Sequence, residues 1–261
     1  RGEGEYAVLG IMQNIRRGFS PFEGEISGAT FYEPNSKSVV KNPITRINNL
    51  DGLPFPAYQL LPQFKFYKAR LRKSPSAPIV TSRGCAYSCI FCSKDIFERK
   101  ITFRSSRNVL DEIEYLVKHY GIRQLDILDD NFAFNNRRMH EILDGIIEQK
   151  YNLAINIQTG IRSELVDEPL LDKMKNAGVY KLAFGIESAD KEVLALCHKQ
   201  INLDKVKDVA RLARKKGFLV YGFFIIGLPG ETDEAFERTL KYVKTLKLDV
   251  ASFCMAVPFV G

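Results

Sequence analysis

Apolar segments of strand length alternate with amphipathic helical segments along most of the sequence, and this alternation limits the fold more than any other feature. Strands are predicted at residues 77–82, 124–128, 153–158, 179–186, 218–226 and 250–257. Apolar residues recur at helical spacing in residues 107–120, 136–149, 168–177, 203–216 and 233–246. Such alternation indicates an α/β protein with a parallel sheet and right-handed crossovers. The sheet is either an open doubly wound sheet or part of a (β/α) barrel, and both bind ligands at the carboxyl ends of the strands.

Composition excludes several other classes. Hydrophobic residues make up 45% and charged residues 26% of the chain, which is typical of a globular protein and argues against disorder. No apolar run approaches the roughly 18 residues of a membrane span, so we expect no transmembrane segment. The net charge of +7 is compatible with an anionic substrate or nucleic acid, although an ordinary basic surface is the preferred explanation. The first residues show no export signal, so we expect a cytoplasmic location.

The first 75 residues lack the strand and helix rhythm of the remainder. Pro54 and Pro56 force extended or turn geometry in this part of the chain. We therefore predict a connector over residues 1–75 and a core over residues 76–261. Within the core, Thr232 is a predicted helix N-cap.

Three of the five cysteines lie within eight residues. Cys85, Cys89 and Cys92 have the spacing C-x3-C-x2-C and follow the first predicted core strand. In a chain without an export signal, such a cluster indicates metal binding rather than disulfides. A structural zinc site needs four ligands, and no fourth Cys or His lies close by in the sequence. Three thiolates on a four-iron cluster would leave one iron open to a substrate or cofactor. Zinc with a distant fourth ligand is the alternative.

Charged residues stand at the carboxyl ends of the next three predicted strands. Asp129 and Asp130 follow the second strand, where a carboxylate could pair with a cation or form a turn. Arg162 follows the third strand and could bind a carboxylate or form an internal ion pair. Glu187 closes the fourth strand, where its charge needs either a ligand or a salt bridge to a Lys or Arg.

With these features, the sequence resembles the radical S-adenosylmethionine (SAM) superfamily. The similarity rests on the cysteine spacing, with Phe91 just before the last cysteine. It also rests on motifs that close predicted strands, namely LDDNF (128–132), FGIES (184–188) and IIGLPGET (225–232). Two N-terminal stretches, RGEGE (1–5) and LDGLPFP (50–56), are similar to the cobalamin-binding branch of that superfamily. The resemblance implies a partial (β/α)6 TIM-like barrel, truncated at its C-terminal end, behind an upstream cobalamin-binding domain that lies outside this sequence.

The resemblance also implies the chemistry. Cys85, Cys89 and Cys92 would hold a [4Fe-4S] cluster that binds SAM, and one electron would cleave SAM to a 5′-deoxyadenosyl radical. A reductant such as flavodoxin or ferredoxin would supply the electron. The radical would drive cobalamin-dependent C-methylation, or a rearrangement, of a small-molecule or peptide substrate. The residues implied to bind SAM or to cover the cluster are Phe91, Asp129, Asp130, Arg162, Gly185, Glu187, Ser188, Ile225 and Ile226.

Two other functions remain as alternatives. An RNA-modifying radical SAM enzyme fits the positive charge, although we find no RNA-binding module and no second cysteine cluster upstream. A non-catalytic iron–sulfur or zinc-binding module fits the cysteines alone. Cleavage of SAM by the reconstituted protein would distinguish an enzyme from such a module.

Overall fold

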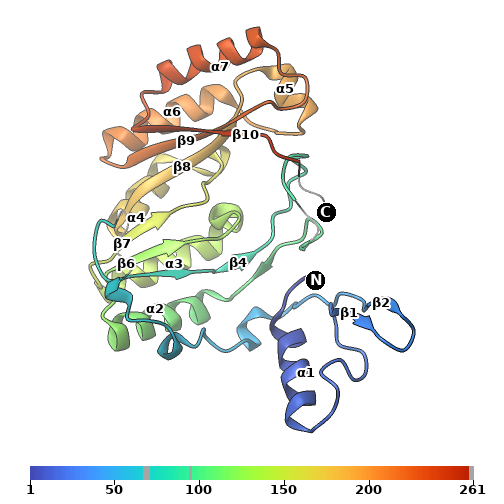
Figure 1. Ribbon diagram of the computed structural model, residues 1–261. Coiled ribbons are helices and arrows are strands. Elements are labelled where there is room, and N and C mark those ends of the chain that lie inside the picture. The colour runs from blue at the N-terminus through green and yellow to red at the C-terminus, as the bar shows by residue number, and fades with distance from the viewer. Residues whose placement is uncertain (67–70, 94–95, 259–261) are drawn as a thin grey trace.

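A curved, six-stranded parallel sheet forms the core of the computed structural model, which describes residues 1–66, 71–93 and 96–258 (Figure 1). Its strands, in spatial order, are β10 (Val250–Met255), β9 (Leu219–Ile226), β8 (Val179–Glu187), β7 (Ala154–Ile157), β6 (Gln124–Ile127) and β3 (Ser76–Ile79). Spatial order follows chain order without the reversal of a doubly wound sheet. The expectation of a partial (β/α)6 barrel is therefore confirmed.

Helices cover the convex side of the sheet (Figure 1). They are α2 (Ser106–Tyr120), α3 (Asn136–Gln149), α4 (Glu168–Ala177), α5 (Lys191–Leu196), α6 (Leu203–Lys215) and α7 (Asp233–Leu246). The predicted cap at Thr232 is confirmed, since its hydroxyl accepts a hydrogen bond from the Ala235 N–H at 3.2 Å. None of the helices in the described ranges is long and apolar enough to cross a membrane.

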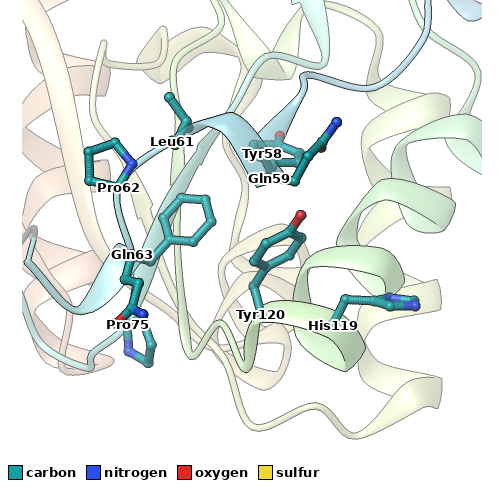
Figure 2. A pocket seen from close by; sticks show the side chains of 9 residues that line it. Tyr58, Gln59, Leu61, Pro62, Gln63, Pro75, His119 and Tyr120 are labelled. Carbon is teal, nitrogen blue, oxygen red and sulfur yellow. The ribbon is translucent and has the colours of Figure 1, made fainter.

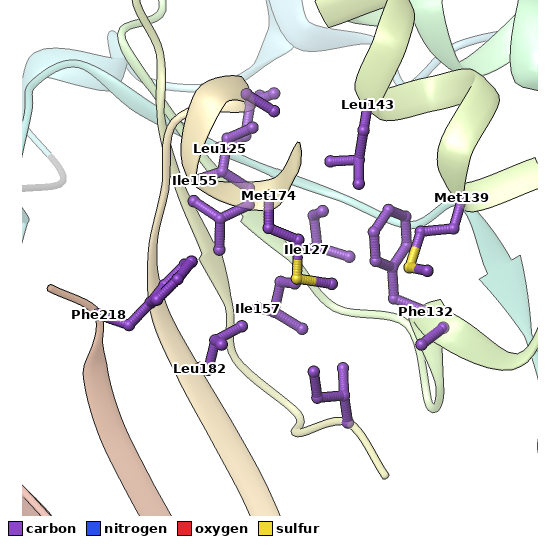
Figure 3. Close-up of a cluster of buried hydrophobic side chains, with 14 of the residues drawn as sticks. Leu125, Ile127, Phe132, Met139, Leu143, Ile155, Ile157, Met174, Leu182 and Phe218 are labelled. Atoms are coloured by element: carbon purple, nitrogen blue, oxygen red, sulfur yellow. The ribbon is translucent and has the colours of Figure 1, made fainter. Parts of the chain in front are cut away.

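The main core lies between the sheet and this helical layer. On β6, Leu125 and Ile127 point into it and meet apolar side chains of α3 such as Met139 and Leu143 (Figure 3). The intervening Asp126 belongs to the other face of the sheet, where its carboxylate accepts a hydrogen bond from Asn156 at 2.7 Å. This alternation places apolar residues against the helices and polar residues on the concave face.

The first predicted core strand is shorter than expected, because the run 77–82 is divided between two strands. β3 ends at Ile79, and β4 (Ser82–Arg83) pairs in antiparallel fashion with β5 (Thr102–Phe103). This two-stranded ribbon leads the chain into and out of the segment that carries Cys85, Cys89 and Cys92.

The segment expected to be a connector contains local structure that the sequence pattern did not predict. It forms α1 (Glu5–Arg16), the hairpin of β1 (Thr30–Glu33) and β2 (Ser38–Lys41), and three single 3-10 turns, Leu50–Gly52, Tyr58–Leu60 and Phe64–Phe66. Helix α1 buries none of its residues.

The connector is fastened to α2 by a buried contact. The Tyr58 hydroxyl donates to a Glu112 carboxylate oxygen at 2.5 Å, and Arg104 pairs with the other oxygen. Burial, the hydrogen bond to Glu112 and its negative charge all raise the pKa of Tyr58. Figure 2 shows a pocket beside this contact, between the connector and the end of α2, lined in part by Tyr58, Tyr120 and His119.

Candidate active site

The loop with the three cysteines begins at the carboxyl edge of the sheet, at a glycine that no other residue could replace without movement. Gly84 has a φ of +87°, and a Cβ there would lie 2.0 Å from the Lys100 carbonyl oxygen. Its N–H donates to the Asp130 carboxylate at 2.8 Å. Cys85 therefore starts from a fixed point between the end of β6 and the strand that returns from the loop.

The three cysteines differ in exposure, and none of the chain's five cysteines, all of which the structure describes, forms a disulfide. Cys89 is buried, Cys85 is half-buried and Cys92 is exposed. Within the described ranges, no three His, Cys, Asp or Glu side chains are gathered as ligands of a single metal ion. Thiolates that hold an iron–sulfur cluster each bind a different iron, so they need not converge on one point. Three cysteines on one short loop suit that arrangement.

The Asp129 side chain faces Thr81 and Ser82, which lead from β3 into β4, and not the open edge of the sheet. It is fully buried, and its carboxylate accepts hydrogen bonds from the Thr81 N–H at 2.6 Å, the Thr81 hydroxyl at 2.5 Å and the Ser82 hydroxyl at 2.6 Å. Burial raises the pKa of Asp129, although these hydrogen bonds oppose the shift. The carboxylate thus holds the chain between β3 and β4. Asp130 remains exposed at the edge while it binds Gly84.

Glu187 closes β8 with an unusual backbone and a cationic partner. Its φ is +68°, which is rare for a residue with a side chain and is often found at binding sites. Its carboxylate lies 3.1 Å from the Lys199 ammonium, and a Cβ at Gly185 would come within 2.7 Å of it. The salt bridge that the sequence left as an alternative is present. Lys199 itself was not predicted, because nothing in the local pattern links it to Glu187.

Arg162 and Phe91 bring the strand ends and the cysteine loop together. The Arg162 guanidinium lies 3.8 Å from the centre of the Tyr87 ring, within the loop. It also lies 3.6 Å from the Glu164 carboxylate, so the internal ion pair that the sequence left as an alternative is present. Phe91 lies with its ring centre 5.9 Å from the Lys199 ammonium. Phe91 also packs with Ile225 of β9 on a small apolar cluster that includes Cys197 and Leu228. The loop therefore contacts residues that follow β7, β8 and β9.

Ser188 and Ile226, which were also predicted to bind SAM, have no contact with the cysteine loop among the contacts described here. Ser188 is fully buried, lies 3.2 Å from the Thr239 hydroxyl, and accepts a hydrogen bond from the Asp190 N–H at 3.1 Å, so in this structure it organises the start of α5. Ile226 is half-buried at the end of β9. The turn that follows is fixed by Glu231, which accepts the Gly227 N–H at 2.5 Å.

An open parallel barrel with a three-cysteine loop at its carboxyl edge suits a protein that holds an iron–sulfur cluster there. The family model of the radical SAM superfamily matches residues 79–243. That match covers more than half of the sequence, and the chain belongs to the radical SAM superfamily. The interpretation as a non-catalytic metal-binding module is thereby replaced by that of an enzyme.

Curated relatives are named as methyltransferases, cyclases and methylthiotransferases. An uncharacterised methyltransferase of Pyrococcus horikoshii is 34% identical over 264 residues, which span 100% of this chain and 55% of that protein. Cytidylyl-2-hydroxyethylphosphonate methyltransferase of Streptomyces wedmorensis is 30% identical across 100% of this chain and 54% of its own. Anaerobic magnesium-protoporphyrin IX monomethyl ester cyclase of Rubrivivax gelatinosus is 28% identical across 99% and 46%. The chain thus spans about half the length of these relatives.

A solved structure shares the fold across nearly the whole chain. The radical SAM methyltransferase TsrM from Kitasatospora setae, with cobalamin and a [4Fe-4S] cluster bound, superposes with a TM-score of 0.76 at 20% identity. The match covers 98% of this chain and 50% of that chain. Superfamily membership implies a [4Fe-4S] cluster and SAM as cofactors, and the three-cysteine loop fits both.

Proposed function

We propose that this chain is the SAM-cleaving core of a cobalamin-dependent radical SAM enzyme that methylates carbon or carries out a related radical rearrangement. The observation that carries the proposal is the cysteine loop, fixed at Gly84 and packed against residues that follow three successive strands. A reduced [4Fe-4S] cluster on Cys85, Cys89 and Cys92 would supply the electron that cleaves SAM.

The protein's part in this reaction is to orient SAM and exclude water. We assign the SAM carboxylate to Arg162, because a guanidinium matches its planar geometry. Asp130 is the exposed carboxylate available to the SAM ammonium, since Asp129 is already occupied by three donors. Glu187 would accept a ribose hydroxyl, with Lys199 balancing its charge.

The remaining predicted residues would shape the SAM pocket. Ile225 and Ile226 at the end of β9 would contact adenine, and Gly185, which has no side chain, leaves room for the Glu187 carboxylate beside the pocket. Phe91 would shield the cluster from water. Ser188 would act from behind the site, through α5.

We also propose that residues 1–75 connect this core to a cobalamin-binding domain outside residues 1–261. Helix α1 supports this, because it exposes five large apolar side chains, namely Tyr6, Val8, Leu9, Met12 and Ile15. The greater length of the relatives supports it as well. Flavodoxin or ferredoxin as the electron donor, a cytoplasmic location, and a small-molecule or peptide substrate belong to the same proposal.

The test is anaerobic reconstitution with iron and sulfide, followed by SAM and a strong reductant. We expect about four irons per chain and release of 5′-deoxyadenosine. Cys89→Ala should abolish both, whereas Cys254→Ala, which alters an exposed cysteine on β10, should retain both. A wild-type protein that binds the cluster but releases no 5′-deoxyadenosine contradicts the proposal. Salt-dependent binding of RNA would instead support the RNA-modifying alternative.

A further inference from the structure

The connector reaches across to the far end of the cysteine loop through one arginine. The Arg46 guanidinium donates to the Phe97 carbonyl at 2.8 Å, to the Lys100 carbonyl at 3.0 Å and to the Thr102 hydroxyl at 2.9 Å. It also lies 5.7 Å from the centre of the Phe97 ring. A planar, multi-donor guanidinium can satisfy several acceptors at fixed angles, so Arg46 defines the path on which the chain leaves the loop.

A second connector residue holds the near end of the loop. The Glu3 side chain is only 3% exposed, and its two oxygens accept hydrogen bonds from Arg83 at 2.7 Å and from the Ile47 N–H at 2.8 Å. Arg83 lies two residues before the first cysteine, and Ile47 directly follows Arg46. Glu3 therefore joins the start of the loop to the segment that holds its end.

The two ends of the loop also touch each other. The Lys100 carbonyl that Arg46 binds is the atom that a Cβ at Gly84 would approach to 2.0 Å, and the Phe97 Cβ would lie at 2.9 Å. A shift of residues 97–100 would therefore change the position of Gly84 and of the adjoining Cys85. The two ends of the cysteine loop are therefore held together, and two of the residues that hold them, Arg46 and Glu3, belong to the connector.

We propose that Arg46, assisted by Glu3, is a positioning residue for the iron–sulfur cluster, acting through the backbone of the cysteine loop. This inference rests on the proposed function, since it takes the loop to be the cluster site. Residues that orient metal ligands without touching the metal typically change metal affinity by about 10–100-fold when they are replaced. The connector is then part of the catalytic core as well as a link to another domain.

The experiment compares Arg46→Ala and Arg46→Lys with Arg107→Ala, a control that removes an exposed arginine whose partner is Asp111. In the protein without iron, the rate at which iodoacetamide alkylates each cysteine is measured by peptide mass spectrometry. We expect iodoacetamide to alkylate the buried Cys89 several-fold faster in Arg46→Ala than in the wild-type protein. The midpoint of urea denaturation reports on the global fold, because the buried Cys197 contacts the loop itself, through a hydrogen bond from the Ile90 N–H to its carbonyl and through packing near Phe91.

The reconstituted proteins provide the second measurement. We expect Arg46→Ala to release iron to a chelator about tenfold faster than wild type and to shift the reduction potential of the cluster. Arg46→Lys keeps the charge and part of the hydrogen bonding, so it should restore part of both properties. If Arg46→Ala also lowers the midpoint of urea denaturation, the comparison passes to Arg46→Lys and Glu3→Gln, which are smaller changes at the same contacts.

Two outcomes separate this inference from the proposed function. Equal Cys89 alkylation and equal iron release in Arg46→Ala and Arg107→Ala would overturn the positioning role and leave the cluster assignment intact. A wild-type protein that binds no cluster would overturn the proposed function, and the positioning role with it. Faster Cys89 alkylation together with faster iron release supports both.

Discussion

The Lys199 ammonium lies 3.1 Å from the Glu187 carboxylate, and both side chains are only about one-tenth exposed. The pair stands at the carboxyl end of β8, beside the Phe91 ring of the cysteine loop. A charge placed there without a partner would have a high desolvation cost. The lysine therefore offsets the cost of placing the Glu187 side chain at the site where we expect SAM to bind.

Lys199→Met should destabilise the protein, because it leaves the Glu187 carboxylate buried and unpaired. We expect a loss of about 3 kcal/mol in the free energy of unfolding at neutral pH. Urea denaturation measures this loss. Arg211→Met, which removes an exposed pair with Asp208, should cost less than about 1 kcal/mol, and an equal cost in both variants contradicts the argument.

Gly84→Ala should lower the free energy of unfolding more than an alanine at another glycine with a similar positive φ. Gly18 has a φ of +79° with nothing within 4 Å of a Cβ, whereas a Cβ at Gly84 meets the Lys100 carbonyl at 2.0 Å. Gly18→Ala should therefore cost only the backbone strain, about 1–2 kcal/mol. Gly84→Ala should cost clearly more and should lower the iron content after reconstitution. Similar stabilities and similar iron contents in the two variants would refute the close approach.

The buried Asp129 should make stability depend on pH. Its pKa is raised in the folded state, so its contribution to stability is complete below the unfolded pKa of about 3.9 and is lost as the pH rises through the folded pKa. Asp129→Asn removes this titration while keeping an acceptor for the Thr81 N–H. We expect the unfolding free energy of wild type, relative to Asp129→Asn, to fall as the pH increases. A difference that rises with pH would mean that the hydrogen bonds outweigh burial.

Arg162→Lys should weaken SAM binding even though the charge is kept. The guanidinium lies 3.8 Å from the centre of the Tyr87 ring, and an ammonium lacks the planar shape that stacks on a ring and the bidentate geometry that binds a carboxylate. We expect the KM for SAM in 5′-deoxyadenosine release to rise about tenfold, while the visible spectrum of the cluster stays the same. Arg137→Ala, on an exposed face of α3, serves as the control. An unchanged KM would remove Arg162 from the SAM site.

Sequence patterns predicted the core and much less of the contacts around the site. The six strands of the main sheet and helices α2, α3, α4, α6 and α7 follow from periodicity, because each buries its own apolar face. Helix α5 and the short strands β4 and β5 were not predicted. The orientation of Asp129 was not predictable, since strand position places it at the edge but its partners, Thr81 and Ser82, lie more than forty residues earlier. The pairing of Glu187 with Lys199 was left open for the same reason. Arg46 was missed entirely, because two of its three acceptors are backbone carbonyls, which leave no trace in side-chain patterns, and the third, Thr102, lies 56 residues away.

The order of the sheet leaves one edge of its last strand unpaired in the part of the chain that the structure describes. Within the described ranges β10 pairs on one side only, with β9, and its end at Met255 is strongly exposed. A row of unused amide and carbonyl groups is a template on which another extended segment can dock. Residues 1–261 by themselves should therefore self-associate through β10 as the protein concentration rises. A charged substitution on this strand should reduce the self-association.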